Sequence, residues 1–429
     1  MKGSFQIIFI ICFIAAAVFG VLVFADVISL GEDPQAPSGT VVLWGTIKSQ
    51  TILPLISDFN SANDSFSVTY VEKSPENFDR DLLEALASGT GPDLYFLPDD
   101  LAFRYSNKLA VIPYQSFPLT EFKNRFAGAG EVFLSGKGVL AFPLLIDPLV
   151  MYYDRSLLDS NGIIYPPATW DDFSTITPIL TEKDNTNKII KSTVALGHYS
   201  NVLHAKDILA AFFLQLGNPI VSEKSGLLHS SLVTNSQADK LGSALQFYTD
   251  FANPSKSLYS WNKSFSNSIN AFSAQDVALY FGFASELEAL VNKNPNQNLG
   301  VTTFPQIKGT PTKLTYGRVT GIAISSFSKN TNTAFTTANL MSNGEFAEKL
   351  AGALGTPPAR RDLLAKKPVD SFSPIFYNSA LYAKSWLDPS TKDTDDIFRT
   401  MIDGVLSNQR TPSDAVSDAH SKLELLLFQ

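Results

Sequence analysis

Residues 138–158 read GVLAFPLLIDPLVMYYDRSLL, and residues 166–173 read PPATWDDF. The first stretch is an apolar run that stops at Asp147-Pro148 and then resumes as far as Tyr153. In the second stretch the paired prolines indicate a turn, and a helix is expected directly after it. Asp147 is therefore either a turn residue or a polar group that the apolar run carries into a site.

Upstream of this stretch, strand and helix patterns alternate. Short apolar or alternating runs predict strands, and apolar residues spaced by three and four predict helices. In chain order the elements lie at 40–44, 52–59, 66–70, 76–88 and 94–97. Alternation with short connections predicts a parallel sheet with helices on both faces. Ligands of such sheets bind at the carboxyl ends of the strands.

Downstream, helical patterns dominate to about residue 290, and strand patterns return at 299–304 and 321–325. Most of the remaining chain is again helical. The final helix is expected to begin at Thr411-Pro412-Ser413-Asp414, which is close to a capping box with proline in the first turn. The fold class expected is therefore α/β.

The composition favours an acidic globular protein. Its 429 residues predict about two to three domains, and 45% hydrophobic against 17% charged residues excludes a disordered chain. A net charge of −8 disfavours nucleic-acid binding, which needs basic patches. Cys12 and four scattered histidines are too few for a zinc site or a cysteine nucleophile, so no metal or cofactor is expected.

The start of the chain differs from the rest. Residues 7–25 carry no charge, follow Lys2 and precede Asp26. About 20 apolar residues span a bilayer, and the positively charged flank stays in the cytoplasm. Residues 1–25 are therefore a signal peptide or a retained membrane anchor, and residues 26–39 are a linker. The body is expected to be extracytoplasmic, tethered to the cell membrane or secreted after cleavage.

Catalytic motifs are scarce. The sequence has neither a G-x-S-x-G nor an H-E-x-x-H motif, and Gly136-Lys137-Gly138 lacks the rest of a P-loop. Asp171-Asp172 lies where a helix begins, which favours a structural role. No enzymatic activity is expected. A glycosidase stays open as an alternative, because a sequence does not show which two carboxylates face one bond.

Aromatic and polar residues near the expected loop ends are typical of a carbohydrate site, in which a mostly apolar cleft holds a few placed polar groups. Trp44 lies within an apolar strand and fits the core better than a ligand contact, and His198 fits a structural role better. Trp261 and Trp386 lie in polar, turn-rich stretches, which predicts exposed rings on a binding surface.

The order of these motifs resembles the extracellular solute-binding proteins of ABC importers, family 1, the maltodextrin and sugar-binding type. The two stretches quoted first are the most specific part of the resemblance, which extends over residues 40–429. The supporting motifs lie at 88–93, 271–282, 299–305, 317–328 and 411–415.

The resemblance implies a periplasmic-binding-protein-like fold of type II, in which two lobes close on a ligand like a hinge. Each lobe would be a parallel-dominated sheet flanked by helices, and the crossovers between the lobes would fall near 146–148 and 316–320. The implied lobes are 40–146 with about 319–370, and 147–318 with about 371–429.

The resemblance also implies site residues. Asp100 would accept from a sugar hydroxyl, Asp147 would be an acidic contact at the first crossover, and Phe283 lies near a stacking aromatic. Leu97 and Leu101 replace an aromatic and a basic residue of the maltodextrin binders, so maltodextrin itself is not expected. The complete set of expected ligand contacts is Trp44, Asp100, Asp147, His198, Tyr199, Trp261, Phe283, Arg318 and Trp386.

The expected function is capture of a small molecule, expected to be a mono- or oligosaccharide, and its delivery to the permease subunits of an ABC transporter. The receptor would act as a monomer, without nucleic acid or cofactor. Two alternatives stay open. One is a sensory or surface-binding module, since a fold does not determine function, and the other is a secreted carbohydrate-active enzyme.

Overall fold

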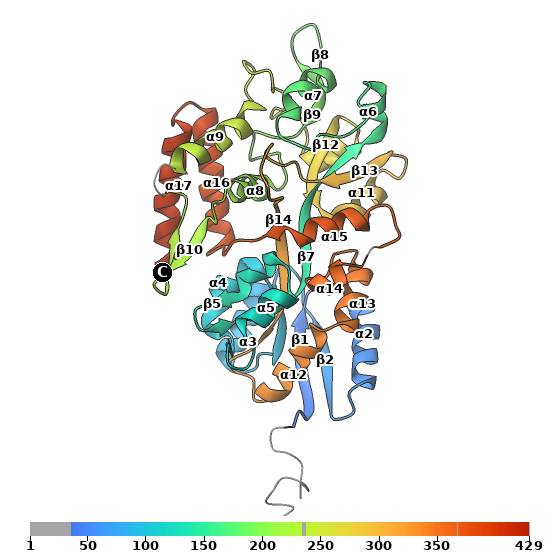
Figure 1. The fold of residues 1–429 in the computed structure, drawn as a ribbon, viewed down its shortest axis with the longest axis vertical. Coiled ribbons are helices and arrows are strands. Elements are labelled where there is room, and N and C mark those ends of the chain that lie inside the picture. Colours follow the sequence, from blue (N-terminus) through green and yellow to red (C-terminus); the bar gives the residue numbers. More distant parts are fainter. Residues whose placement is uncertain (1–35, 234–236, 367, 429) are drawn as a thin grey trace, which may run out of the picture.

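The computed structural model describes residues 36–233, 237–366 and 368–428 (Figure 1). The expected membrane segment, residues 1–25, lies outside these residues, as does most of the expected linker. Within the described ranges, no helix is both long enough and apolar enough to cross a bilayer.

The first lobe, drawn at the bottom of Figure 1, is built around three parallel strands. β1 (Gly39–Gly45) pairs with β2 (Phe66–Glu72) on one side and with β3 (Leu94–Pro98) on the other. Helices α2 (Ser49–Ser61) and α3 (Phe78–Ser88) connect these strands, and each buries an apolar stripe. The alternation of strand and helix expected for this part of the chain is confirmed.

Two long strands cross the middle of the molecule. β7 (Ala141–Asp154) contains the apolar run with its Asp147-Pro148 interruption, and β14 (Thr315–Ile324) runs antiparallel to it. Asp147 lies opposite Arg318 in this pairing. Figure 1 shows both strands continuing from the first lobe into the second lobe above it. Asp147 is therefore a strand residue, and β14 begins earlier than the expected strand at 321–325.

The second lobe extends the same sheet. β12 (Val277–Phe283) and β13 (Leu299–Thr303) both pair with β7, and β12 also pairs with β9 (Ile189–Val194), which pairs with β8 (Glu182–Lys183). The strand order is β2-β1-β3-β14-β7-β12-β9-β8, with β13 on β7 and β15 (Ala383–Lys384) on β14. One mixed sheet of ten strands thus joins the two lobes.

This sheet is less parallel than expected. β14 runs antiparallel to both β3 and β7, and β7 runs antiparallel to β12 and β13. The parallel strands expected in each lobe are present, as β1, β2 and β3 in the first lobe and β9 and β12 in the second, but antiparallel pairs lie beside them. The reason is that β7 and β14 cross between the lobes in opposite directions, so each lobe receives antiparallel neighbours.

Two separate hydrophobic cores confirm the expected two-lobed α/β arrangement. Ile146 of β7 and Val319 of β14 belong to the core of the first lobe, whereas Leu149 and Tyr316 belong to that of the second. The change of core falls at the crossovers that the resemblance implies. Burial of one large apolar side chain contributes about 1.5–3 kcal/mol, so each core stabilises its own lobe.

The chain passes between the lobes again near its C-terminus. In α15 (Ser373–Leu381), Phe376 packs in the second core and Ala380 in the first. Ala383 of β15 is also in the first core, and Trp386 returns to the second. This passage adds a third connection beside the two long strands.

Helices and short strands complete the two lobes. The first lobe contains η1 (Asp99–Leu101), α4 (Ala102–Tyr105), η2 (Ser106–Lys108), β4 (Ile112–Pro113), α5 (Leu119–Arg125), η3 (Gly128–Phe133), β5 (Leu134–Ser135), β6 (Gly138–Val139), α12 (Thr331–Met341), α13 (Glu345–Leu354) and α14 (Arg361–Leu364). The second lobe contains α6 (Arg155–Ser160), α7 (Asp172–Leu180), α8 (Ala205–Gln215), β10 (Val221–Lys224), β11 (Leu227–Ser230), α9 (Gln237–Asp250), α10 (Ser268–Ser273), η4 (Ala284–Glu286), α11 (Leu287–Lys293), α16 (Thr391–Leu406) and α17 (Pro412–Leu427). The capped start expected for the final helix is confirmed, because Thr411 accepts a hydrogen bond from the Asp414 amide.

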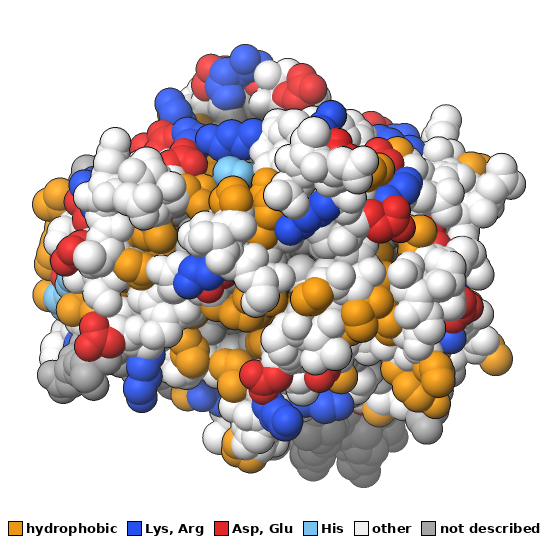
Figure 2. All heavy atoms as spheres, turned by 90° about the horizontal axis from the view of Figure 1, so that it is seen from above, with side chains coloured by type: hydrophobic (Ala, Val, Ile, Leu, Met, Phe, Trp, Pro, Cys, Tyr) orange, Lys and Arg blue, Asp and Glu red, His pale blue; other side chains and the backbone are white. Residues whose placement is uncertain are grey.

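Figure 2 shows the molecule from the second-lobe end. Acidic and basic side chains are interspersed on this face, and hydrophobic side chains lie among them. Neither charge forms a continuous patch in this view. This face is therefore an ordinary solvated surface, on which scattered apolar side chains are common.

Candidate functional site

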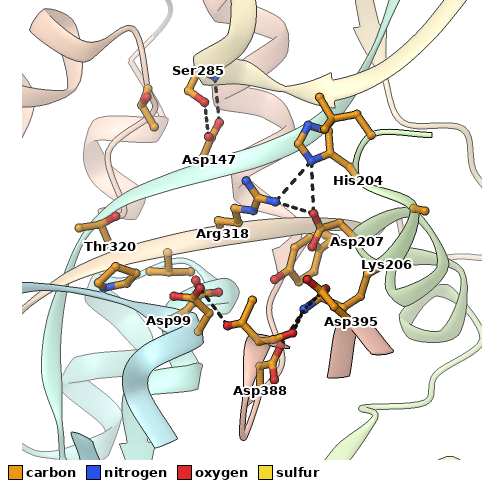
Figure 3. Close-up of a pocket in the computed structure, with 18 of the residues that line it drawn as sticks. Asp99, Asp147, His204, Lys206, Asp207, Ser285, Arg318, Thr320, Asp388 and Asp395 are labelled. Atoms are coloured by element: carbon orange, nitrogen blue, oxygen red, sulfur yellow. Dashed lines mark hydrogen bonds and ion pairs between the residues drawn. The ribbon is translucent and has the colours of Figure 1, made fainter. Parts of the chain in front are cut away.

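A cavity of about 880 Å³ lies where the two lobes meet, and the crossing strands contribute to its wall (Figure 3). Its lining comes from the end of β3, from β7 and β14, from the loop before α8, and from the segment that leads into α16. The charged side chains of the lining are Asp99, Asp100, Asp147, Lys206, Asp207, Arg318, Asp388 and Asp395, with His204 among them.

Two aspartates follow β3 directly, at the carboxyl end of a parallel strand. Asp99 is only 4% exposed and accepts a hydrogen bond from the Ser385 hydroxyl. Burial, together with the neighbouring Asp100 charge, raises the pKa of Asp99 to about 7. Asp100 Oδ2 accepts from Thr391 Oγ1 at 3.2 Å, and burial raises its pKa too. Carboxylates of the first lobe thus bond to the segment that enters the second.

Asp147 lies on β7 at the crossover. Its carboxylate accepts from the backbone N–H of Ser285 at 3.0 Å and from the Ser285 hydroxyl at 2.5 Å. Burial raises the pKa of Asp147 to about 6, although these hydrogen bonds favour its charged form. Figure 3 shows Asp147 and Ser285 on the opposite side of the Arg318 side chain from Asp388.

Arg318 projects from β14 into the cavity. Its Nη2 donates to Asp207 Oδ2 at 2.6 Å, and the guanidinium lies 3.9 Å from the centroid of the Phe283 ring. Burial alone would lower the pKa of Arg318, but Asp207 and other nearby groups raise it. The side chain stays 47% exposed, so it is held at one end and open to the cavity at the other.

His204 and Glu286 support this ion pair. The His204 ring is paired with Glu286 through Nε2, and its Nδ1 lies 3.4 Å from Arg318 Nη2. Glu286 also accepts from the Tyr280 hydroxyl at 2.6 Å. Sequence reasoning missed His204, Asp207 and Glu286. The signal that could have found the first two is their spacing of three residues at the start of a helix, which places both on one face.

Lys206 occupies the other side of the α8 start. Its Nζ lies 3.1 Å from Asp388 Oδ2 and 2.8 Å from Asp395 Oδ1. Burial would lower the pKa of Lys206, but the Asp388 and Asp395 carboxylates raise it. Both Lys206 and Arg318 are therefore held in ion pairs, while Asp99, Asp100 and Asp147 have hydroxyl or amide donors.

The cavity brings together four of the nine residues expected to contact ligand. Asp100, Asp147, Tyr199 and Arg318 all line it. Phe283 is fully buried and lies beneath the Arg318 guanidinium, so it contacts that side chain and is not part of the lining.

His198 and Trp44 lie outside the cavity lining. The His198 carbonyl accepts from the Tyr248 hydroxyl at 2.8 Å, and its Nδ1 is buried without a hydrogen-bond partner among the described residues. Trp44 packs against the core of the first lobe, with Lys73 Nζ 3.6 Å from its ring centroid. The strand context of Trp44 had already favoured this core position.

The expectation of exposed rings at Trp261 and Trp386 is wrong. Trp261 is 0% exposed and stacks on Phe265 with the ring centroids 4.6 Å apart, and Trp386 is 4% exposed beside Phe398. Polar neighbours in sequence were misleading, because each ring turns inward to the core of the second lobe, and the polar residues Ser260 and Asp388 beside them are buried too. The Trp261 indole N–H donates to Asn201 Oδ1 at 3.0 Å, and Asn201 lines the cavity.

The cavity is suited to binding a polar molecule by hydrogen bonds. Its lining includes carboxylates, the Arg318 guanidinium, the Asn201 side chain and the two tyrosines Tyr199 and Tyr316. Among the described residues, no group of three or more histidine, cysteine or acidic side chains is arranged to hold a metal ion.

Comparisons with known proteins bear on the family and the fold. Residues 45–359 match the family model for bacterial extracellular solute-binding protein. No curated protein matches the chain.

Similar solved structures share the fold at low identity. One is the GacH receptor of Streptomyces glaucescens, solved unliganded and with acarbose, at TM-score 0.67 and 19% identity over 91% of this chain and 99% of that one. A cyclo/maltodextrin-binding protein complexed with maltotetraose has TM-score 0.73 and 17% identity over 92% and 98%. The sugar-binding protein MalE of Xanthomonas citri has TM-score 0.73 and 16% identity over 91% and 97%.

Proposed function

We infer that this chain, which belongs to the family of bacterial extracellular solute-binding proteins, captures a carbohydrate between its lobes and delivers it to an ABC-type permease. The observation that carries this proposal is the polar cavity at the crossovers, where both lobes and both long strands supply hydrogen-bonding groups. Similar folds that are named for sugar binding or were solved with acarbose support the carbohydrate assignment.

The chemistry of the lining fits sugar hydroxyls. Asp100 and Asp147 have carboxylate oxygens that can accept from hydroxyl groups, and Arg318 has N–H groups beyond the one bonded to Asp207. The rings of Tyr199 and Tyr316 offer apolar faces to the C–H side of a sugar. Hydrogen bonds to charged groups are about twice as strong as neutral ones, so these side chains would dominate affinity.

Closure of the lobes would couple binding to transport. A ligand that touches Asp100 of the first lobe and Lys206 or Tyr199 of the second makes all of its contacts only when the lobes are together. Its binding free energy then shifts the equilibrium from open to closed. The closed form would be the one that docks on the permease.

We propose that the lobes are 40–146 with about 319–370, and 147–318 with about 371–429. The distribution of the two cores supports the divisions on β7 and β14. Near the C-terminus, the passage of the chain between Phe376 and Trp386 supports a boundary spread over α15 and β15.

We also propose that the receptor is a monomer and is tethered outside the cytoplasm by residues 1–25 or released when they are cleaved. The uncharged run at 7–25 supports either outcome. A tether would raise the effective concentration of the receptor at its permease. Cell fractionation with mass spectrometry of the mature N-terminus distinguishes the two, and gel filtration of the body tests the monomer.

A thermal-shift and calorimetry screen tests the carbohydrate assignment. Maltotetraose, mannotriose and D-tagatose, each bound in a solved structure of similar fold, are suitable first probes. A sugar at 100 times its dissociation constant should add about 2.7 kcal/mol to the free energy of unfolding. The response should be lost in Asp147→Asn, in the cavity, and kept in Asp58→Asn, whose carboxylate pairs with Lys349 on the surface.

Two results would contradict this proposal in different ways. If no sugar moves the melting temperature while a polyamine or phosphate ester does, the carbohydrate assignment is wrong and the receptor role remains. If an oligosaccharide is recovered shortened after incubation, the protein is an enzyme. The proposal expects the sugar to be recovered unchanged.

A further inference from the structure

We propose that His204 is a positioning residue that determines how Arg318 is held at the cavity wall, and that its protonation makes ligand affinity depend on pH. The proposal rests on the proposed function in one respect, namely that Arg318 touches the ligand. The positioning itself follows from contacts within the protein.

Two side-chain nitrogens, one of Arg318 and one of His204, lie near the same carboxylate oxygen of Asp207. Arg318 Nη2 lies 2.6 Å from Asp207 Oδ2, and His204 Nδ1 lies 3.5 Å from the same oxygen. His204 Nδ1 and Arg318 Nη2 are 3.4 Å apart. The two nitrogens therefore approach the same oxygen of Asp207, and the protonation state of Nδ1 decides whether Arg318 is its single donor or shares it with His204. Figure 3 shows the three side chains meeting at this point.

The neutral ring favours the arrangement around Arg318. Nε2 faces Glu286, so a neutral His204 that donates through Nε2 has a lone pair on Nδ1. That lone pair accepts from Arg318 and leaves Asp207 Oδ2 to the guanidinium. In this state, Asp207, Phe283 and His204 hold one end of Arg318 together.

Protonation reverses the role of Nδ1. An imidazolium donates through both nitrogens, and so pairs with Glu286 and Asp207 at once. It also places a positive charge beside the Arg318 guanidinium, which repels it. Arg318 then loses part of its hold on Asp207 and its fixed direction at the cavity wall.

The groups that face His204 favour its protonated form. They are Glu286 of η4, Asp207 within α8 and Arg318 of β14, with Phe283 edge-on at 4.8 Å between ring centroids. Further out, the Tyr280 hydroxyl of β12 donates to Glu286, Asp147 of β7 lies opposite Arg318, and Lys206 follows in α8. Burial alone would lower the pKa of His204, but its hydrogen bonds with Asp207 and Glu286 raise it above the usual value.

The backbone conformation of His204 supports its role as the residue that positions Arg318. His204 precedes α8 in the left-handed conformation, at φ 64° and ψ 23°. This conformation is unfavourable for most residues other than glycine, asparagine and aspartate, and here it directs the ring between Glu286 and Arg318. Asparagine tolerates the conformation and has no group that titrates between pH 5 and 9, so His204→Asn is the informative variant.

Linkage gives the direction of the effect. If sugar binds best when Arg318 is held, it binds best to neutral His204, so affinity should rise as pH rises through the titration of His204. By reciprocity, bound sugar should lower the pKa of His204, by one pH unit for each tenfold difference in affinity between the two protonation states.

Nuclear magnetic resonance of the ligand-free receptor tests the positioning without any sugar. The Arg318 Nε–Hε signal should move with the same midpoint as the His204 ring in the wild type, and this movement should vanish in His204→Asn. Glu286→Gln should move both midpoints to lower pH. An Arg318 signal that ignores the titration of His204 would overturn the proposal.

Calorimetry with maltotetraose, mannotriose and D-tagatose from pH 5.5 to 8.5 tests the coupling. Wild-type affinity for the sugar that binds should rise about fivefold or more with pH. His204→Asn should lose this rise and keep only the pH dependence that the cavity carboxylates Asp99 and Asp147 contribute. His229→Asn is the matched control, because His229 pairs with Glu424 at 2.7 Å away from the cavity lining and should keep the wild-type slope. An unchanged slope in His204→Asn refutes the coupling. If no probe binds while the Arg318 signal follows His204, the positioning stands and the sugar assignment fails.

Discussion

Arg318 of strand β14 and Asp207 of helix α8 are joined by a 2.6 Å contact between Nη2 and Oδ2. The pair links a strand that crosses between the lobes to the first turn of a second-lobe helix. The Asp207 side chain is 8% exposed, so its charge depends on this partner. Burial would raise the pKa of Asp207, but Arg318 and His204 lower it to about 2.

Arg318→Gln should therefore weaken both the fold and the site. Loss of a hydrogen bond to a charged group costs about 1.5–3 kcal/mol, and the remaining Asp207 carboxylate is nearly buried. Chemical denaturation should show this loss in the free energy of unfolding, and calorimetry should show weaker sugar binding. Arg80→Gln, which breaks an exposed pair with Asp81, should change neither quantity. If Arg318→Gln and Arg80→Gln have the same free energy of unfolding and the same sugar affinity, Arg318 supports neither the fold nor the site.

Asp99 should make stability fall as pH rises. Its folded pKa of about 7 lies above the ordinary aspartate value, so the protonated form favours the fold at low pH. That contribution is lost as pH rises from about 4 through 7.

Asp99→Asn keeps an acceptor for the Ser385 hydroxyl and removes the buried charge. At pH 8 the variant should be more stable than the wild type, by at most about 4 kcal/mol at 1.4 kcal/mol per pH unit. The difference should disappear near pH 4. Denaturant titrations of both proteins at pH 4 and pH 8 measure this difference. If the difference between variant and wild type is the same at both pH values, the buried charge is not its cause.

Trp261 should influence binding through Asn201. Trp261→Phe keeps an aromatic ring against Phe265 and removes the indole donor to Asn201. A neutral hydrogen bond contributes about 0.5–1.5 kcal/mol, so the loss of sugar affinity should be at most about 10-fold. Trp386→Phe is the control, because that ring packs beside Phe398 without lining the cavity. If only the control variant loses sugar affinity, Trp261 does not influence binding through Asn201.

Thr391 should favour the closed arrangement of the lobes. Its hydroxyl, at the start of α16, donates to Asp100 of the first lobe at 3.2 Å. Thr391→Val removes this bond and should shift the ligand-free receptor toward the open form, which small-angle X-ray scattering detects as a larger radius of gyration. Thr400→Val, on the same helix, removes only an exposed bond to the Asp396 carbonyl and should leave the radius unchanged.

Local patterns were sufficient for much of the fold. Apolar spacing along 40–97 determined the alternating strands and helices, because side-chain periodicity of two or three to four residues reflects the backbone geometry itself. The same reasoning placed Asp100 after a parallel strand, at the edge where ligands bind. The interruption of an apolar run marked Asp147 as a site candidate before any contact was known.

What only the tertiary structure decided is which distant residues meet. Strand β14 lies between β3 and β7 and directs Arg318 toward the start of α8. This placement brings together the four residues of the cluster, His204, Asp207, Glu286 and Arg318. Pairing between strands far apart in sequence depends on the packing of the whole sheet, so no local pattern predicts it. Burial of Trp261 was likewise a tertiary outcome, since the second-lobe core and the Asn201 side chain that surround its ring come from distant parts of the sequence.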